Sequence, residues 1–188
     1  MEALDGYVQI VEKDYVMLLI CDIDGTIANC SHRVQRIPDW DAFHEGMADD
    51  PPILPMVNLA RLFAFNQSGV GLTRYCSGLF FLTGRPHQYR IPTEQWIERE
   101  CGLHVGDDYQ LLMRPNDDWT PDAEMKSRLL DSALEPWGCI QKWGEGLGLT
   151  ITNEWLRRHA IFLEDRDRVV EMWRGRGYCC LQPKEGEY

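Results

Sequence analysis

Short runs of continuously apolar residues alternate along the chain with longer segments whose apolar positions recur at helical spacing. A continuous apolar run of about four to eight residues is typical of a strand buried on both faces, whereas apolar positions about three to four residues apart favour an amphipathic helix. The pattern predicts strands at 16–21, 79–82, 109–113, 160–163 and 178–181. It predicts helices at 53–66, 92–101, 122–134 and 167–174, and a short helix beginning near Asn153.

Strands that alternate with helices predict an α/β fold with one open, mostly parallel, doubly wound sheet covered by helices on both faces. Two segments interrupt this alternation. Residues 29–52 are polar and contain Pro38, Pro51 and Pro52, so we expect an irregular insertion after the first strand. Residues 135–149 combine one proline, four glycines and two tryptophans without a clear period. The length of 188 residues fits a single domain, which we expect to span 1–188.

Composition narrows the class of protein. The hydrophobic fraction of 44% is enough for a packed core and is not typical of a disordered chain. The apolar run at 16–21 is too short to cross a bilayer, and the segment before it is acidic, unlike the start of a signal peptide. We therefore expect a soluble cytoplasmic protein. The seven cysteines form no CxxC pair, so we expect reduced thiols rather than a zinc site.

The net charge of −11 bears on the kind of partner. Binding to nucleic acid depends on Lys and Arg that neutralise phosphates, and an acidic surface repels it. The charge therefore argues against a general nucleic-acid-binding protein. It leaves room for an enzyme with a local basic pocket.

Asp22-Ile23-Asp24-Gly25-Thr26, directly after the first predicted strand, is the strongest sign of chemistry in the sequence. Two carboxylates at the end of a buried strand are costly unless they are paired or bind a metal. Gly25 allows the backbone to turn sharply. One carboxylate can attack phosphorus while the other handles the proton of the leaving group. In open α/β sheets ligands bind beyond the carboxyl ends of the strands, so this segment predicts an active site.

The segment resembles motif one of the haloacid dehalogenase (HAD) superfamily of Rossmann-like phosphatases, and three further segments resemble the other motifs in the expected order. The resemblance implies that Asp22 is the nucleophile and that Asp24 is the general acid and base. Thr83 resembles the residue that hydrogen-bonds the phosphoryl group. Lys126 resembles the lysine that offsets the charge of the aspartyl phosphate.

Glu164-Asp165, after the strand predicted at 160–163, resembles the acidic pair of motif four, which holds magnesium. The resemblance implies Mg²⁺ bound by the side chains of Asp22 and Asp165, the backbone carbonyl of Asp24, and waters. Glu164 stands where the phosphatase domains described in the next paragraph have Asp. Its longer side chain shifts the geometry, so we expect it to support the site without binding the ion.

The second half is also similar to the phosphatase domain of bacteriophage polynucleotide kinase-phosphatase. The matching stretches are Thr83-Gly84-Arg85 and residues 165–174, and the resemblance covers about residues 16–182. Thr120 stands where that family has a second Arg, and residues 135–155 are longer than the family's connection. The resemblance implies that Gly84, Arg85 and Arg114 contact the substrate and that Asp118 and Asp122 support the site.

This closer resemblance implies removal of 3′-phosphates from DNA or RNA ends during end repair. The insertion at about 29–52 would be a small cap that leaves the site open to a polymer end. No GxxxxGK[ST] motif occurs, so we expect a stand-alone phosphatase without a kinase half. Two alternatives stay open: a phosphatase for free nucleotides or other small phosphate esters, which the net charge and Thr120 favour, and a catalytically inactive magnesium-binding module.

Overall fold

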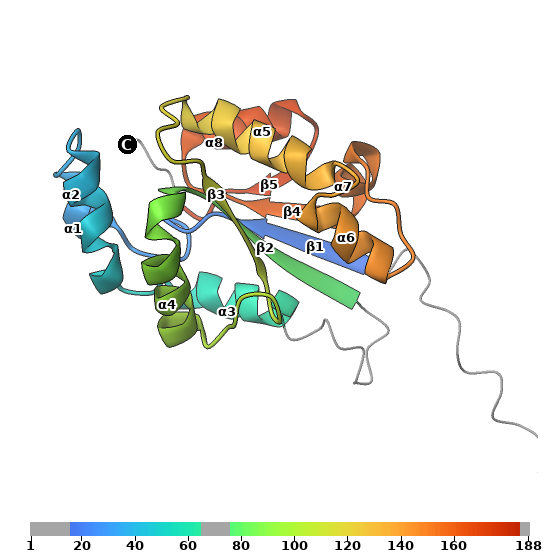
Figure 1. Cartoon of the computed structure of the whole chain (residues 1–188), viewed down its shortest axis with the longest axis horizontal. Coiled ribbons are helices and arrows are strands. Elements are labelled where there is room, and N and C mark those ends of the chain that lie inside the picture. The colour runs from blue at the N-terminus through green and yellow to red at the C-terminus, as the bar shows by residue number, and fades with distance from the viewer. Residues whose placement is uncertain (1–15, 65–75, 185–188) are drawn as a thin grey trace, which may run out of the picture.

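The computed structural model describes residues 16–64 and 76–184. Its strands form one sheet in the order β3-β2-β1-β4-β5, and every neighbouring pair is parallel, which confirms the predicted doubly wound α/β fold. The sheet crosses the centre of the molecule (Figure 1). The strands are β1 (Val16–Cys21), β2 (Cys76–Pro86), β3 (Gln110–Arg114), β4 (Ala160–Leu163) and β5 (Cys179–Leu181).

β2 is longer than the apolar run at 79–82 predicted. It continues through Thr83-Gly84-Arg85 to Pro86, a stretch whose glycine and proline favour a turn in the sequence. Its pairing with β3 shifts register between Thr83 and Pro86, so the strand carries an irregularity where the polar residues begin. β1 and β4 have the predicted bounds, and β3 and β5 each begin one residue later than predicted.

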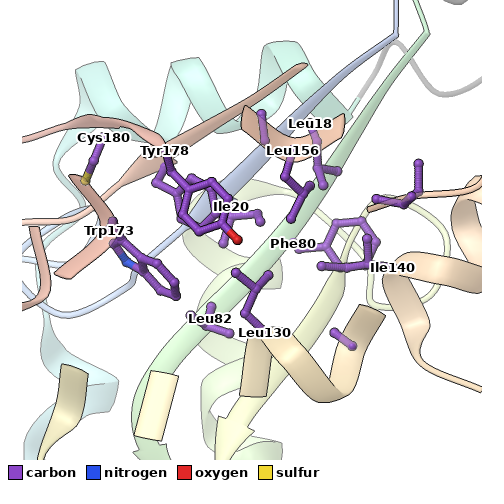
Figure 2. Close-up of a cluster of buried hydrophobic side chains, with 14 of the residues drawn as sticks. Leu18, Ile20, Phe80, Leu82, Leu130, Ile140, Leu156, Trp173, Tyr178 and Cys180 are labelled. Carbon is purple, nitrogen blue, oxygen red and sulfur yellow. The ribbon is translucent and has the colours of Figure 1, made fainter. Parts of the chain in front are cut away.

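Helices cover both faces of the sheet, and each face has its own apolar core. α3 (Leu54–Ala64) and α4 (Arg90–Cys101) pack on one face with residues such as Leu19 and Phe81. The last two residues of the helix predicted at 53–66 lie outside the described residues. Figure 2 shows the core of the other face, where Phe80, Leu130 and Trp173 meet. The helices on that face are α5 (Asp122–Leu134), α6 (Cys139–Gly146), α7 (Asn153–His159) and α8 (Asp167–Gly175).

The segment at 135–149, without a period in the sequence, forms α6 and packs on the sheet through Trp143. A side-chain carbon added to Gly78 in β2 would lie 2.7 Å from the Trp143 ring, so the indole needs a glycine beneath it. The ring also meets Phe80 edge-on, with centroids 6.1 Å apart. α7 follows and begins at Asn153, as the sequence predicted. Its N-cap is Thr152, whose hydroxyl accepts from the Trp155 N–H.

The insertion at 29–52 is more regular than expected, since it contains α1 (Ser31–Val34), α2 (Trp40–Glu45) and the 3-10 helix η2 (Gly46–Asp49). Asp39 caps α2 by accepting from the Ala42 N–H, a local signal that the prolines obscured. α1 and α2 lie beyond the carboxyl ends of the strands (Figure 1). The 3-10 helix η3 (His87–Tyr89) connects β2 to α4. None of the helices in the described ranges is both long and apolar enough to cross a membrane.

Candidate active site

Asp22 lies directly after β1 and contacts a buried lysine. Its backbone N–H donates to the Leu163 carbonyl of β4, which fixes the carboxylate at the edge of the sheet. The ammonium group of Lys126 donates to Asp22 Oδ1 at 2.7 Å and to Glu164 Oε2 at 2.6 Å. All three side chains are buried. Residues from β1, α5 and the end of β4 therefore meet at one point, as the order of the motifs predicted.

Asp22, Glu164 and Asp165 form an acidic cluster whose ligand oxygens lie within 4.8 Å of one another. Burial raises the pKa of Asp22, and the Glu164 carboxylate raises it further, against the opposing effect of Lys126. Burial likewise raises the pKa of Glu164. Ionising these acids together is therefore unfavourable without more positive charge. Clustered carboxylates are ligands that Mg²⁺ accepts, so the site fits a divalent cation. Among the residues the structure describes, no His or Cys belongs to this cluster.

Asp24 is held by two buried arginines. Arg85 donates to both carboxylate oxygens, through Nε to Oδ2 at 3.0 Å and through Nη2 to Oδ1 at 2.6 Å. Arg33, from α1 in the insertion, donates to the same Oδ1. The turn that presents Asp24 depends on Gly25, whose φ of 83° is in the region that favours glycine.

Asp50, at the end of the insertion, completes this network. Its carboxylate accepts from Arg33 Nε at 2.8 Å and Nη2 at 2.6 Å, and from Arg85 Nη2 at 3.2 Å. Burial alone would raise the pKa of Asp24, but Arg85 and Arg33 outweigh it and hold the pKa of that carboxyl below its usual range. Asp24 is therefore ionised at neutral pH and fixed in orientation.

Two arginines expected to contact the substrate are occupied within the protein. Arg85 is fully buried, and the contacts described above direct it to Asp24 and Asp50 rather than to the pocket. Arg114 lines the pocket, but its guanidinium donates to the carbonyls of Gly84, Asp118 and Thr120. Both arginines thus organise the site in this structure, a role that the sequence pattern did not distinguish from a direct phosphate contact.

Of the remaining predicted residues, Gly84, Asp118 and Asp122 line the same pocket as Asp22, whereas Thr83 does not. The Thr83 side chain is fully buried and its hydroxyl accepts from the Arg85 N–H at 3.3 Å. Asp122 accepts from Arg114 at 2.7 Å and from Arg166 at 3.0 Å. A side-chain carbon on Gly84 would lie 2.7 Å from Asp122 Oδ1, so this glycine allows the carboxylate to approach the backbone. Asp118 accepts from Arg128 at 2.7 Å, at the edge of the pocket.

A pocket of about 430 Å³ opens onto Asp22 and Asp24. Sequence reasoning missed three residues of the site. Arg33 and Asp50 belong to the network that holds Asp24 and do not line the pocket, and they stand in a polar insertion where no spacing marks them. Trp119 lines the mouth and stands alone between polar residues. The aromatic residues of the lining are Trp40, Phe43, His44 and Trp119.

Comparisons with known proteins agree with this geometry. The sequence model of one family, described as the phosphatase domain of polynucleotide kinase PNKP, matches residues 17–137. The chain is 26% identical over 168 residues to a protein of Autographa californica nuclear polyhedrosis virus whose assigned name is bifunctional polynucleotide kinase/RNA ligase. The match covers 89% of this chain and 19% of that protein.

Two solved structures share the fold. One is the Pnkp1/Rnl/Hen1 complex, with a TM-score of 0.63, 23% identity, and coverage of 93% of this chain and 47% of that chain. The other is the Pnkp1/Rnl/Hen1 RNA repair complex, with a TM-score of 0.60, 23% identity, and coverage of 93% and 44%. The chain thus spans less than half the length of these relatives.

Proposed function

Because the chain belongs to the family of polynucleotide kinase phosphatase domains, a family of HAD phosphatases, we propose that it removes 3′-phosphates from DNA or RNA ends through an aspartyl phosphate on Asp22. The observation that carries this proposal is the contact between Asp22 and Lys126 at 2.7 Å, beside a pocket that opens onto the same carboxylate. The names of the relatives, which join polynucleotide kinase with RNA ligase or RNA repair, support a nucleic-acid end as the substrate.

In the first half of the proposed reaction an oxygen of Asp22 attacks phosphorus. A new P–O bond forms to the carboxylate while the P–O bond to the sugar oxygen breaks, and that oxygen takes a proton from Asp24. Asp24 is ionised in the resting site. A bound phosphate dianion would raise its proton affinity, since a like charge nearby favours the neutral form, and Asp24 would take up a proton from solvent as the substrate binds. Lys126 offsets the negative charge of the Asp22 phosphate.

In the second half a water attacks the phosphorus of the aspartyl phosphate. Asp24 accepts the proton of that water, the P–O bond to Asp22 breaks, and inorganic phosphate leaves with Asp22 again a carboxylate. Asp24 then releases its proton to solvent and returns to the ionised form. The two arginines that hold Asp24 keep the base oriented for this step.

Asp22, Asp165 and the backbone carbonyl of Asp24 would hold Mg²⁺. When bound, the ion would stabilise the charge on the transferring phosphoryl oxygens as a Lewis acid. Glu164, which contacts Lys126 at 2.6 Å, would support this site without binding the ion.

One observation favours a phosphatase for mononucleotides as a second candidate function. Repulsion from acidic side chains would oppose entry of a polyanion, and the pocket carries two arginines, Arg114 and Arg166, beside its aspartates. The aspartates that line it are Asp22, Asp24, Asp41, Asp117, Asp118 and Asp122.

A substrate panel with phosphate release as the readout separates these functions. We expect a 3′-phosphorylated oligonucleotide to give a much higher kcat/KM than 3′-nucleoside monophosphates, because adjoining nucleotides supply binding energy that orients the phosphate. A 5′-phosphorylated oligonucleotide should be a poor substrate, since its leaving oxygen lies on another side of the sugar. Equal rates on oligonucleotide and mononucleotide would favour the second candidate. No phosphate release from any substrate with ample Mg²⁺ would indicate an inactive magnesium-binding module.

A further inference from the structure

The pocket has an aromatic part that the proposed chemistry does not use. Its volume of about 430 Å³ falls within the range of about 300–1,000 Å³ typical of small-molecule sites, so it has room for more than a phosphate group. Trp40 and Phe43 line it from α2 of the insertion, and Trp119 lines it from the segment between β3 and α5. Two elements far apart in sequence thus bring tryptophans to the cavity of the nucleophile.

Trp119 combines a fixed backbone with an exposed ring. The guanidinium of Arg114 donates to the carbonyls on either side, Asp118 at 2.9 Å and Thr120 at 2.7 Å. Asp118 Oδ1 also accepts from the Thr120 N–H at 2.9 Å. Trp119 nevertheless remains 78% exposed. An indole held at a pocket mouth by such a backbone is positioned to stack on a ligand without first ordering a loop.

Trp40 is positioned by a stack of rings that joins the insertion to the domain. Its ring lies over that of His44, with centroids 6.3 Å apart and planes 29° apart. The His44 ring in turn lies 5.1 Å from that of Tyr89 in η3. The Tyr89 hydroxyl donates to Asp41 Oδ1 of α2 at 3.2 Å. Trp40 is therefore held at the pocket before any ligand binds.

The charge of the residues that line the pocket indicates which part of a substrate can lie against Trp40 and Trp119. Six aspartates line the pocket, and its two arginines both contact Asp122. A second phosphate of the substrate would meet this excess of negative charge. A flat uncharged ring would instead gain contact with the indoles, because stacking of a base on an aromatic side chain depends on its π face and not on charge.

We propose that Trp40 and Trp119 form a nucleobase subsite that stacks the base of the nucleotide carrying the phosphate. This inference rests on the proposed function and explains how the same site would select its substrate. Because every base offers a π face, the subsite selects phosphorylated nucleotides and nucleic-acid ends over esters without a ring, without preferring one base.

The test compares two 3′-phosphorylated oligonucleotides that differ only in whether the terminal nucleotide carries its base. For the wild type, the ratio of kcat/KM with the base to kcat/KM without it should be about 5 to 150, the range of one stacked base. Trp119→Ala should bring this ratio towards one, and Trp119→Phe should keep most of it. Trp40→Ala should lower the ratio as well, with thermal unfolding confirming that each variant is folded.

Trp137→Ala is the matched control, because Trp137 is 72% exposed and does not line the pocket. It should keep the wild-type ratio. A wild-type ratio near one, or an unchanged ratio in both Trp119→Ala and Trp40→Ala, would overturn the subsite while leaving the 3′-phosphatase intact. If glycerol 2-phosphate is hydrolysed and neither oligonucleotide is, the subsite and the proposed substrate are both wrong.

Discussion

Arg33 in the insertion and Asp24 after β1 form an ion pair in which the arginine side chain is fully buried and the aspartate side chain is 8% exposed. The same guanidinium bonds Asp50 and the Phe43 carbonyl. The insertion therefore contributes to the orientation of the proposed acid and base, besides lining the pocket above it. Arg33 acts through Asp24, so we assign it a positioning role.

Replacing Arg33 should affect both stability and turnover. Arg33→Met leaves two buried carboxylates with fewer partners, and breaking a buried pair costs about 3–5 kcal/mol, which denaturant unfolding would measure. Arg33→Lys keeps the charge but replaces the planar guanidinium, which bonds Asp50 through both Nε and Nη2, with a single ammonium nitrogen, so kcat should fall about 10-fold or more with little change in KM. Arg128→Met is the control: the Arg128 side chain is 55% exposed, and its pair with Asp118 should contribute at most about 1 kcal/mol. Equal losses of stability in Arg33→Met and Arg128→Met would contradict the structural role.

Asp22→Asn should abolish phosphate release while the protein stays folded. The amide keeps the shape of the side chain and removes the attacking charge, and loss of a nucleophile lowers kcat by about 10⁴-fold or more. Burial and Glu164 raise the pKa of Asp22, so its ionised form destabilises the metal-free fold at neutral pH. The variant should therefore unfold at no lower temperature than the wild type in chelator. Phosphate release by the variant at a substantial fraction of the wild-type rate would exclude Asp22 as the nucleophile.

Chelation should remove activity and Mg²⁺ should restore it. Asp165→Asn removes one carboxylate of the acidic cluster, and we expect a higher Mg²⁺ concentration at half-maximal activity, by about 10-fold or more. Asp131→Asn, at an exposed carboxylate paired with Arg176, should keep the wild-type Mg²⁺ dependence. Zn²⁺ should not be required, because no soft ligand belongs to the described cluster. Full activity in chelator would refute the metal assignment.

Acid should destabilise the fold through His44. Burial lowers the pKa of His44 from 6.5 to about 4 against the opposing effect of Asp24, and Arg33 and Arg85 lower it further. Between these two pH values the unfolded chain binds more protons than the folded one, so stability is lost as the pH falls from about 6.5 to about 4. The loss should be about 3 kcal/mol, since each unit of pKa corresponds to about 1.4 kcal/mol.

His44→Phe keeps a ring in the stack and removes the titration. Its free energy of unfolding, measured by denaturant at several pH values, should fall less steeply than that of the wild type in this window. His104→Phe is the control, because the His104 side chain is 61% exposed. Parallel pH curves for the wild type and His44→Phe would show that His44 does not set the acid sensitivity.

The fold followed from the sequence wherever one local pattern decided an element. The α5 helix has the predicted bounds because Pro121, Asp122 and Glu124 mark its start and the apolar positions keep helical spacing. β2 was underestimated because Gly84 and Pro86 favour a turn locally, whereas parallel pairing with β3 extends the strand through them. Pairing between segments that are distant in the sequence cannot be predicted from the local pattern of residues.

The site likewise contains residues that a local motif predicts and residues whose role depends on contacts between distant segments. Asp22, Lys126 and Glu164 meet as the order of their motifs indicated, although 104 and 38 positions separate the lysine from the two acids. Arg33 and Asp50 follow no motif, and their importance comes from a network that crosses from the insertion to Arg85 in β2. Which guanidinium faces the substrate and which faces a carboxylate is decided by packing, so the sequence could not assign Arg85 between these roles.

The Arg33 network has a consequence for recombination of related proteins. A chimera that exchanged the segment between Ala28 and Ile53 would lose Arg33, which donates to Asp24, and Asp50, whose carboxylate pairs with Arg33. An incoming segment without an arginine and an acid in these places would leave Arg85 to hold Asp24 alone. Substrate choice therefore cannot be transplanted with this segment unless the two buried charges are inherited with it.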